Sequence, residues 1–160
     1  MAVTVRPITL WRKELQDRPG ALADSLAPLT EAAIDVQILM AYRFPGEPDR
    51  AAVELFPVTG KRATAAADQA GFGASGIPAL LVEGDDSPGL GHRLSRAIAV
   101  AGINLDFVVA QVIGRKYSAV FGFADDQGAR TAVAIIKKES AAGRRRSTAA
   151  RPRRKTRGSR

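Results

Sequence analysis

The feature of this sequence that most constrains its fold is the repetition of two short motifs at one spacing. Asp-Arg-Pro-Gly at residues 17–20 recurs as Asp-Ser-Pro-Gly at residues 86–89. Ala-Ile-Asp at residues 33–35 recurs as Gly-Ile-Asn at residues 102–104, and both recurrences are 69 residues apart. A fixed spacing of this size indicates a duplicated structural unit. The 160-residue chain is therefore predicted to hold two small, similar domains.

The first unit is predicted to contain three strands and two helices in the order β-α-β-β-α. Residues 3–15 are rich in β-branched and apolar residues, and residues 33–42 and 50–56 flank a turn with proline and glycine, so these three segments are predicted strands. One helix is predicted after Pro19, because proline suits the first position of a helix. A second helix is predicted over the alanine-rich residues 61–70.

The second unit is predicted to repeat this order. Strands are predicted at residues 77–83, 104–113 and 117–124, with a short turn between the last two. Ser87 is the predicted N-cap of the first helix, whose apolar residues recur at helical spacing. The second helix is predicted over residues 127–138. The two units therefore match element by element.

This element order predicts an α+β fold of two ferredoxin-like units, each an antiparallel sheet with its helices on one face. A complete unit of this kind has a fourth strand after its second helix, and neither unit has room for one. Each three-stranded sheet would leave an unprotected edge, which favours edge-to-edge pairing of the units in one sheet of about six strands. The predicted boundaries are 1–72 for the first unit, 73–142 for the second and 143–160 for a tail.

The repeated pattern resembles the ACT domain family. The resemblance is carried by Asp-x-Pro-Gly at a strand-to-helix turn, an apolar helix, and Ala/Gly-Ile-Asp/Asn at the start of the next strand. It covers nearly all of residues 1–138 as a tandem pair. It implies small regulatory modules that bind amino acids or similar molecules, often at interfaces between paired modules, and that control an enzyme or regulator. Because no catalytic domain is attached, it implies a stand-alone, non-enzymatic tandem ACT protein.

The two strand-to-helix turns are the candidate ligand-binding sites. A helix N-terminus presents free N–H groups and a partial positive charge, so it can hold a carboxylate, and glycine lets a ligand approach the backbone. Asp17 or Asp86 would receive an ammonium group, and the amide of Asn104 suits either part of an amino acid. The predicted ligand-binding residues are Asp17, Pro19, Gly20, Asp86, Ser87, Gly89, Leu90, Gly91, Ile103 and Asn104.

A purely structural role for the same residues is the alternative. An acidic residue before a helix is favoured by the helix dipole, serine caps a helix, and Pro-Gly forms a turn. If the turns do bind ligand, the second is predicted to be the stronger site. Gly89 and Gly91 leave more open backbone than Gly20 followed by Ala21 and Leu22.

Other kinds of site lack the residues that they need. The sequence has no cysteine and a single histidine, His92, which leaves no thiolate or histidine-rich metal site and makes any Ser-His-Asp triad depend on that residue. Residues 71–76, Gly-x-Gly-x-x-Gly, match a dinucleotide-binding motif, but they follow a predicted helix and precede a predicted strand, the reverse of the required order. No catalytic residue, metal or cofactor is predicted.

The tail holds the whole positive excess of the chain. Residues 144–160 carry nine Lys or Arg and no acid, whereas residues 1–143 carry 15 basic and 16 acidic residues. The tail is predicted to be disordered, because it has no large apolar residue to bury. It suits phosphate contacts with nucleic acid, the body then serving as a dimerisation scaffold; an anionic membrane surface, or no partner, are the alternatives. The tail residues considered for nucleic acid are Arg144, Arg145, Arg146, Arg151, Arg153, Arg154 and Lys155.

The expected location is the cytoplasm. The N-terminal residues show no signal-peptide pattern, and the absence of cysteine fits a reducing compartment. The most apolar stretch, residues 97–113, is interrupted by polar residues and predicts no membrane span. Exposed sheet edges and apolar strand residues such as Ile38, Met40, Val108 and Val112 predict a homodimer.

Overall fold

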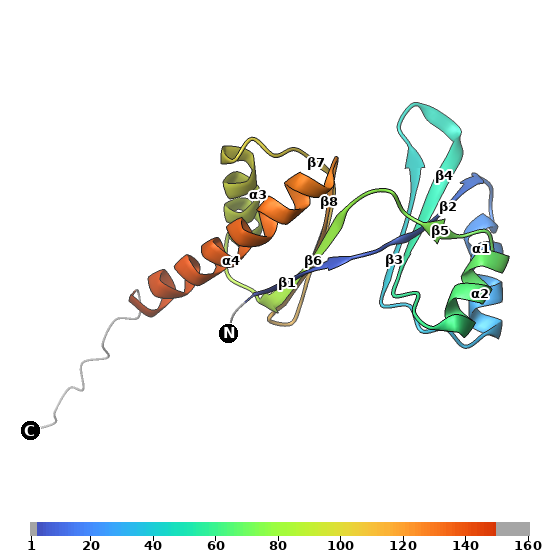
Figure 1. Ribbon diagram of the computed structural model, residues 1–160, viewed down its shortest axis with the longest axis horizontal. Coiled ribbons are helices and arrows are strands. Elements are labelled where there is room, and N and C mark those ends of the chain that lie inside the picture. Colours follow the sequence, from blue (N-terminus) through green and yellow to red (C-terminus); the bar gives the residue numbers. More distant parts are fainter. Residues whose placement is uncertain (1–2, 150–160) are drawn as a thin grey trace, which may run out of the picture. The chain divides into compact units, whose positions relative to one another are not determined.

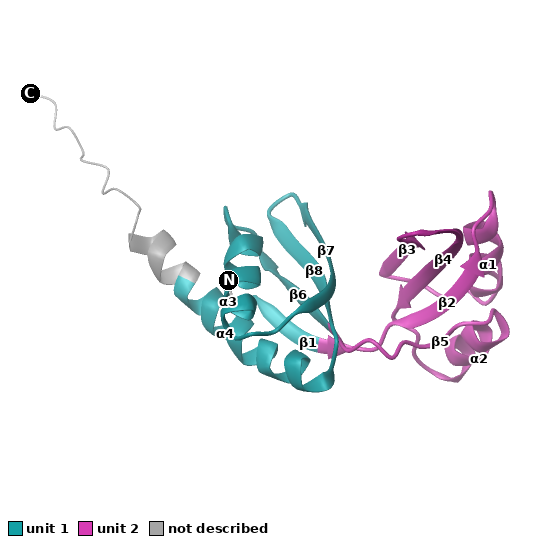
Figure 2. Ribbon diagram, turned by 90° about the horizontal axis from the view of Figure 1, so that it is seen from above, with its two compact units in different colours: residues 1–6, 80–160 teal, residues 7–79 magenta. Residues whose placement is uncertain are grey.

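The computed structural model describes residues 3–149, with side chains described through residue 142. The chain forms two compact units, shown in different colours in Figure 2. Residues Pro7–Ala79 form one, the inserted unit, and the described residues on both sides of that segment form the other, the outer unit. Each unit is an antiparallel four-stranded sheet with two helices on one face (Figure 1). The predicted α+β fold of two ferredoxin-like units is therefore confirmed.

The inserted unit has the strand order β3-β4-β2-β5. Its elements are β2 (Trp11–Gln16), α1 (Ala21–Glu31), β3 (Ile38–Phe44), β4 (Glu47–Phe56), α2 (Lys61–Gln69) and β5 (Gly73–Ala74). Leu29 of α1 packs with Val53 and Leu55 of β4, and the small buried residues of α2, such as Ala67, complete this core. Burying each large side chain contributes about 1.5–3 kcal/mol, and this burial joins the helices to the sheet.

The outer unit has the matching strand order β1-β6-β8-β7. Its elements are β1 (Thr4–Ile8), β6 (Ala79–Asp85), α3 (Leu90–Val100), β7 (Leu105–Ile113), β8 (Lys116–Phe123) and α4 (Asp126–Ala149). Leu90, Leu94 and Ile98 recur every four residues and form the buried face of α3. They pack with Phe121 and Phe123 of β8 in the core of this unit.

Both units contain a fourth strand, so the prediction of two incomplete sheets is wrong. In the inserted unit the fourth strand is the two-residue β5, which pairs with Trp11 and Arg12 of β2. In the outer unit it is β1, which comes from the start of the chain and lies beside β6. The predicted strand over residues 3–15 is thus two strands that belong to different sheets. Because each unit covers the edge beside its first strand internally, the six-stranded sheet predicted from edge-to-edge pairing does not form.

The boundaries of the units also differ from the predicted 1–72 and 73–142. The inserted unit runs from Pro7 to Ala79, because the residues before Pro7, which include most of β1, belong to the outer unit. The tail was predicted to begin at residue 143, but α4 runs through Ala149 and includes Arg144, Arg145 and Arg146. Alanine and arginine are strong helix formers, which explains this extension. The remaining predicted tail residues, Arg151, Arg153, Arg154 and Lys155, lie outside the described part of the chain.

Candidate functional site

The two strand-to-helix turns have the same backbone conformation. Gly20 and Gly89 precede α1 and α3 with φ values of 86° and 75°, a left-handed conformation that glycine adopts without strain. Neither helix has a side-chain cap, so the prediction of Ser87 as an N-cap is wrong. The Ser87 hydroxyl instead accepts a hydrogen bond from Arg93 at 2.7 Å. Both helices therefore present N-terminal N–H groups without a side-chain acceptor, as an anion-binding turn requires.

An arginine side chain braces each turn. In the inserted unit, Arg18 donates to the carbonyl of Pro19 at 3.2 Å and to the carboxylate of Asp24 at 2.6 Å. In the outer unit, Arg93 donates to the carbonyl of Pro88 at 2.8 Å as well as to Ser87. The arginine thus precedes the turn in one unit and follows it in the other. Different residues therefore hold the same turn conformation in the two units. Aligning the two repeats by residue type does not reveal this correspondence.

The turn of the inserted unit borders a cavity of about 290 Å³. Its lining residues come from β2, β3, β4 and the start of α1, and they include Asp17, Gly20, Leu22, Arg43 and Ala51. Asp17 lies in this cavity but forms an ion pair with Arg43. Its carboxylate is therefore already neutralised and would have to leave Arg43 to receive an ammonium group.

A buried tyrosine occupies the corresponding position in the outer unit. Asp17 donates its backbone N–H to Asp49, and Asp86 donates its own to Arg115, so these residues correspond in the two sheets. Two residues further along the chain, the inserted unit has Ala51 and the outer unit has Tyr117. Tyr117 is 6% exposed. The tyrosine fills space that the alanine leaves open.

The hydroxyl group of Tyr117 is buried without a hydrogen-bond partner. It lies beside the start of α3, 4.0 Å from the position that a Cβ atom on Gly91 would take. Burial raises the pKa of Tyr117, and the nearby charge of Asp86 raises it further. A buried polar group without a partner costs about 1–3 kcal/mol, so a ligand that reached this hydroxyl would recover part of that energy.

Asp86 completes this second turn. Its side chain is exposed, and it forms no ion pair or side-chain hydrogen bond with the described residues. The turn therefore collects an unpaired carboxylate, an unsatisfied hydroxyl and an uncapped helix N-terminus. The carboxylate of Asp86 matches the ammonium group of an amino acid, and the hydroxyl and the helix N-terminus match its carboxylate.

The predicted residues Ile103 and Asn104 lie at the other end of α3. This helix has 11 residues between the turn at Gly89 and the start of β7, a length of about 16 Å at 1.5 Å per residue. Ile103 packs towards Gly128 of α4, with its Cγ2 atom 3.3 Å from the position of a Cβ atom there. Asn104 is exposed. The outer unit thus brings together Asp86, Ser87, Pro88, Gly89, Leu90 and Gly91, but not Ile103 or Asn104.

The residues that sequence reasoning missed at the second turn are Tyr117 and Arg93. Asp49 and Arg115 are structurally equivalent but 66 residues apart, because seven residues lie between the paired Arg43 and Ala51 and only four lie between the paired Val112 and Tyr117. The 69-residue spacing therefore does not align Tyr117 with Ala51, which is its structural equivalent. Leu90, by contrast, was predicted to contact ligand and is a core residue, 4% exposed.

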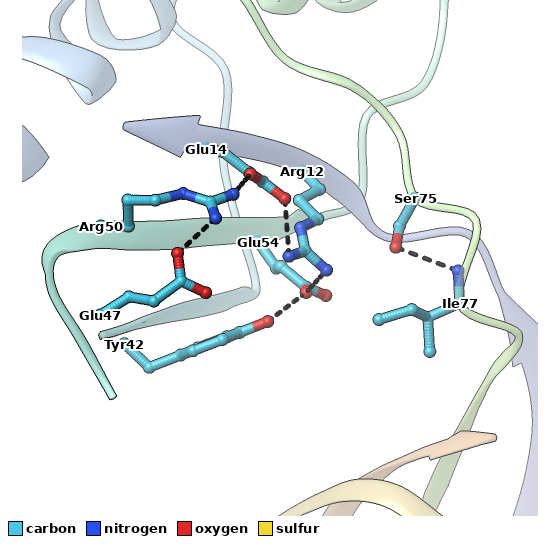
Figure 3. A network of polar contacts seen from close by, with 8 residues as sticks. All are labelled: Arg12, Glu14, Tyr42, Glu47, Arg50, Glu54, Ser75 and Ile77. Atoms are coloured by element: carbon cyan, nitrogen blue, oxygen red, sulfur yellow. Dashed lines mark hydrogen bonds and ion pairs between the residues drawn. The ribbon is translucent and has the colours of Figure 1, made fainter. Parts of the chain in front are cut away.

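A polar network lies on the sheet of the inserted unit (Figure 3). Tyr42, which also lines the cavity, donates a hydrogen bond at 2.7 Å to Glu54, whose side chain is wholly buried. Burial and this bond raise the pKa of Tyr42 to about 12. Arg50 bonds Glu14 at 2.6 Å and holds the pKa of that carboxyl below its ordinary value. The network joins β2, β3 and β4, and Tyr42 is its member in the lining of the first cavity.

Two further properties concern metals and membranes. Within residues 3–142, no three acidic, histidine or cysteine side chains lie close enough together to hold a metal ion. No helix in the described part of the chain is long and apolar enough to cross a membrane.

Several solved structures share this fold. A protein from Bacteroides thetaiotaomicron matches at 12% identity with a TM-score of 0.67, covering 84% of this chain and 90% of that one. The ligand-free regulatory subunit of aspartate kinase from Thermus thermophilus matches at 17% identity with a TM-score of 0.56, covering 87% and 97%. No family model and no curated protein matches the sequence. The structural similarity establishes that the chain has the tandem ACT-type fold that its repeated motif resembles.

Proposed function

We propose that this chain is a non-enzymatic regulatory module that binds an amino acid or a similar small ligand at the strand-to-helix turn of the outer unit. The observation that carries the proposal is the unsatisfied hydroxyl of Tyr117 beside the uncapped start of α3, with the unpaired carboxylate of Asp86 at the same turn. The regulatory subunit of Thermus thermophilus aspartate kinase has the same fold, which supports a regulatory role.

The ligand is oriented by charge. Its carboxylate lies on the N–H groups of Gly91 and His92, where the helix dipole favours an anion, because the N–H of Leu90 already donates to the carbonyl of Ser87. Its ammonium group pairs with Asp86, and its carboxylate or a polar side chain accepts a hydrogen bond from Tyr117. Gly91 has no side chain to block the approach to that hydroxyl. Arg93 keeps the turn in place through its bonds to Ser87 and Pro88.

The turn of the inserted unit is proposed as the weaker site. It offers a cavity of about 290 Å³, but its two candidate charged side chains are already paired, Asp17 with Arg43 and Arg18 with Asp24. A ligand there has to break an ion pair or bind through the helix N-terminus alone. Replacing an existing ion pair with a ligand contact gains less free energy than satisfying polar groups that have no partner.

We propose further that the protein forms a homodimer through β7. This strand lies at the edge of the outer sheet, and no charged side chain occurs between Phe107 and Ile113. Val108, Val109, Val112 and Ile113 are 42%, 48%, 50% and 69% exposed. A long apolar edge strand without charges favours pairing with another chain. Val112 lies opposite Tyr117 in the register of β7 and β8, so a second copy would lie near the ligand-binding turn.

The test is calorimetry after a screen of the twenty amino acids for a rise in melting temperature, since a ligand that binds only the folded state stabilises it. For the amino acid that stabilises most, Asp86→Asn and Tyr117→Phe are each expected to weaken binding about tenfold, the loss of one charge-assisted or buried hydrogen bond. Ser95→Ala, an exposed position on α3, is the matched control and is expected to change nothing. Unchanged affinity in both turn variants would refute the proposed site.

A further inference from the structure

A groove between α3 and α4 is not accounted for by the proposed function. It has a volume of about 580 Å³ and runs along the two helices of the outer unit, which pack against each other (Figure 1). The residues that define it are His92, Arg96 and Val100 of α3 and Ile135, Lys138 and Glu139 of α4. Ligand-binding sites commonly have volumes of about 300–1,000 Å³, so the groove is large enough for a small molecule.

The floor of the groove is apolar and exposed. Val100 is 81% exposed, and Ala97, Ala101 and Ile135 lie beside it along the groove. A single exposed valine needs no explanation, but a row of apolar side chains from two helices in one depression provides a surface for an apolar group. The floor therefore selects for a ligand with a hydrocarbon part.

The rim of the groove is basic. Arg96 of α3 and Lys138 of α4 are exposed, and neither forms an ion pair within the described residues. Arg93, in contrast, also borders the groove but has both terminal nitrogens bonded to the turn. Among the described residues of the lining, Glu139 is the single acidic one. The groove thus offers two available cations, one from each helix, next to an apolar floor.

We propose that this groove binds a small amphipathic anion, a molecule with an alkyl chain and a phosphate or carboxylate head. The chain lies on Val100, Ala97 and Ile135, and the head pairs with Arg96 and Lys138. The two cations, Arg96 and Lys138, favour an anionic head group, and the apolar residues of the lining favour a hydrocarbon tail. This site is separate from the strand-to-helix turn, and its ligand differs in chemistry from an amino acid.

The experiment uses the full chain and octyl phosphate as the probe, with the single histidine of the sequence as the reporter. Because His92 lines the groove, its ring-proton NMR signals are expected to shift on titration. Inorganic phosphate and 1-octanol supply the head and the tail separately, and each is expected to bind at least about tenfold more weakly. Octanoate tests the carboxylate head, and the tighter of the two amphiphiles identifies the preferred head group.

Matched variants locate the binding. Lys138→Ala is expected to weaken octyl phosphate about fivefold, whereas Lys137→Ala, its exposed neighbour outside the groove, is expected to leave it unchanged. Val100→Asp is expected to abolish binding, whereas Ala99→Asp, equally near the end of α3 but outside the groove, is not. Tyr117→Phe is expected to leave octyl phosphate binding intact, which separates this site from the proposed amino-acid site.

Three results would overturn the inference. The first is the absence of any His92 shift with octyl phosphate, and the second is an equal effect of the Lys137 and Lys138 variants. The third is a fall in sedimentation mass caused by Val100→Asp but not by Ala99→Asp, because the groove would then be an interface between copies of the chain.

Discussion

The two tyrosines of this chain give opposite expectations for the same substitution. The hydroxyl of Tyr117 is buried without a partner, whereas the hydroxyl of Tyr42 donates at 2.7 Å to the buried Glu54. Removing an unsatisfied buried group relieves a cost of about 1–3 kcal/mol, and removing the donor of a hydrogen bond to a charged group costs about 1.5–3 kcal/mol. Tyr117→Phe is therefore expected to raise the free energy of unfolding by about 1 kcal/mol, and Tyr42→Phe to lower it by about 2 kcal/mol.

The assay is urea unfolding of the full chain followed by circular dichroism, with equal denaturant dependence required of all variants before their midpoints are compared. Calorimetry on the same samples measures the affinity for the stabilising amino acid. Tyr117→Phe is expected to weaken that affinity about tenfold while the fold becomes more stable. Tyr42→Phe is expected to affect stability and to leave binding at the outer turn unchanged.

A loss of stability in Tyr117→Phe as large as that in Tyr42→Phe would contradict this expectation. That result would mean that the Tyr117 hydroxyl has a partner in solution and is no free donor. A gain in stability with unchanged affinity would instead support the buried, unsatisfied hydroxyl and reject its role in ligand binding. The two measurements therefore test the structural observation and the functional proposal separately.

Four other predictions follow from particular contacts. Gly122→Ala is expected to destabilise the outer unit by about 1–3 kcal/mol, because its Cβ would lie 2.2 Å from the ring of Phe107; Phe107→Leu in the same chain should restore most of the lost melting temperature. Burial and the bond to Glu54 raise the pKa of Tyr42 to about 12, so the stability that this hydroxyl contributes is present below pH 10 and is lost as pH rises towards 12; urea midpoints across that interval measure it. Val109→Lys on the edge strand is expected to reduce the sedimentation mass to that of one chain, and an unchanged dimer would exclude pairing through β7. Ending the chain after Ala149 is expected to preserve stabilisation by an amino acid and to remove polyanion binding, since the proposed ligand site lies within the outer unit and residues 151–160 carry six of the nine tail charges; loss of the amino-acid effect would count against that site.

The sequence alone determines the repeat and the type of each unit. The paired Asp-x-Pro-Gly turns and the helical spacing of Leu90, Leu94 and Ile98 are local patterns, and local patterns decide turns and buried helix faces. The positions of Gly20 and Gly89, both with positive φ, were also predictable, because a strand-to-helix turn of this kind favours glycine. For these reasons the fold class and the positions of the turns agree with the structure.

Only the tertiary structure decides which strands share a sheet and which groups at a turn lack partners. The sheet that β1 joins is formed by residues more than 70 positions away, and neither its sequence nor that of β5 specifies the partner. Tyr117 was missed because hairpins of different length shift the repeat by three residues. Ser87 was predicted as a cap because its residue type does not show that its hydroxyl accepts a hydrogen bond from Arg93 instead. Strand pairing and hydrogen-bond satisfaction depend on contacts between segments far apart in the chain, and such contacts exist only after the chain has folded.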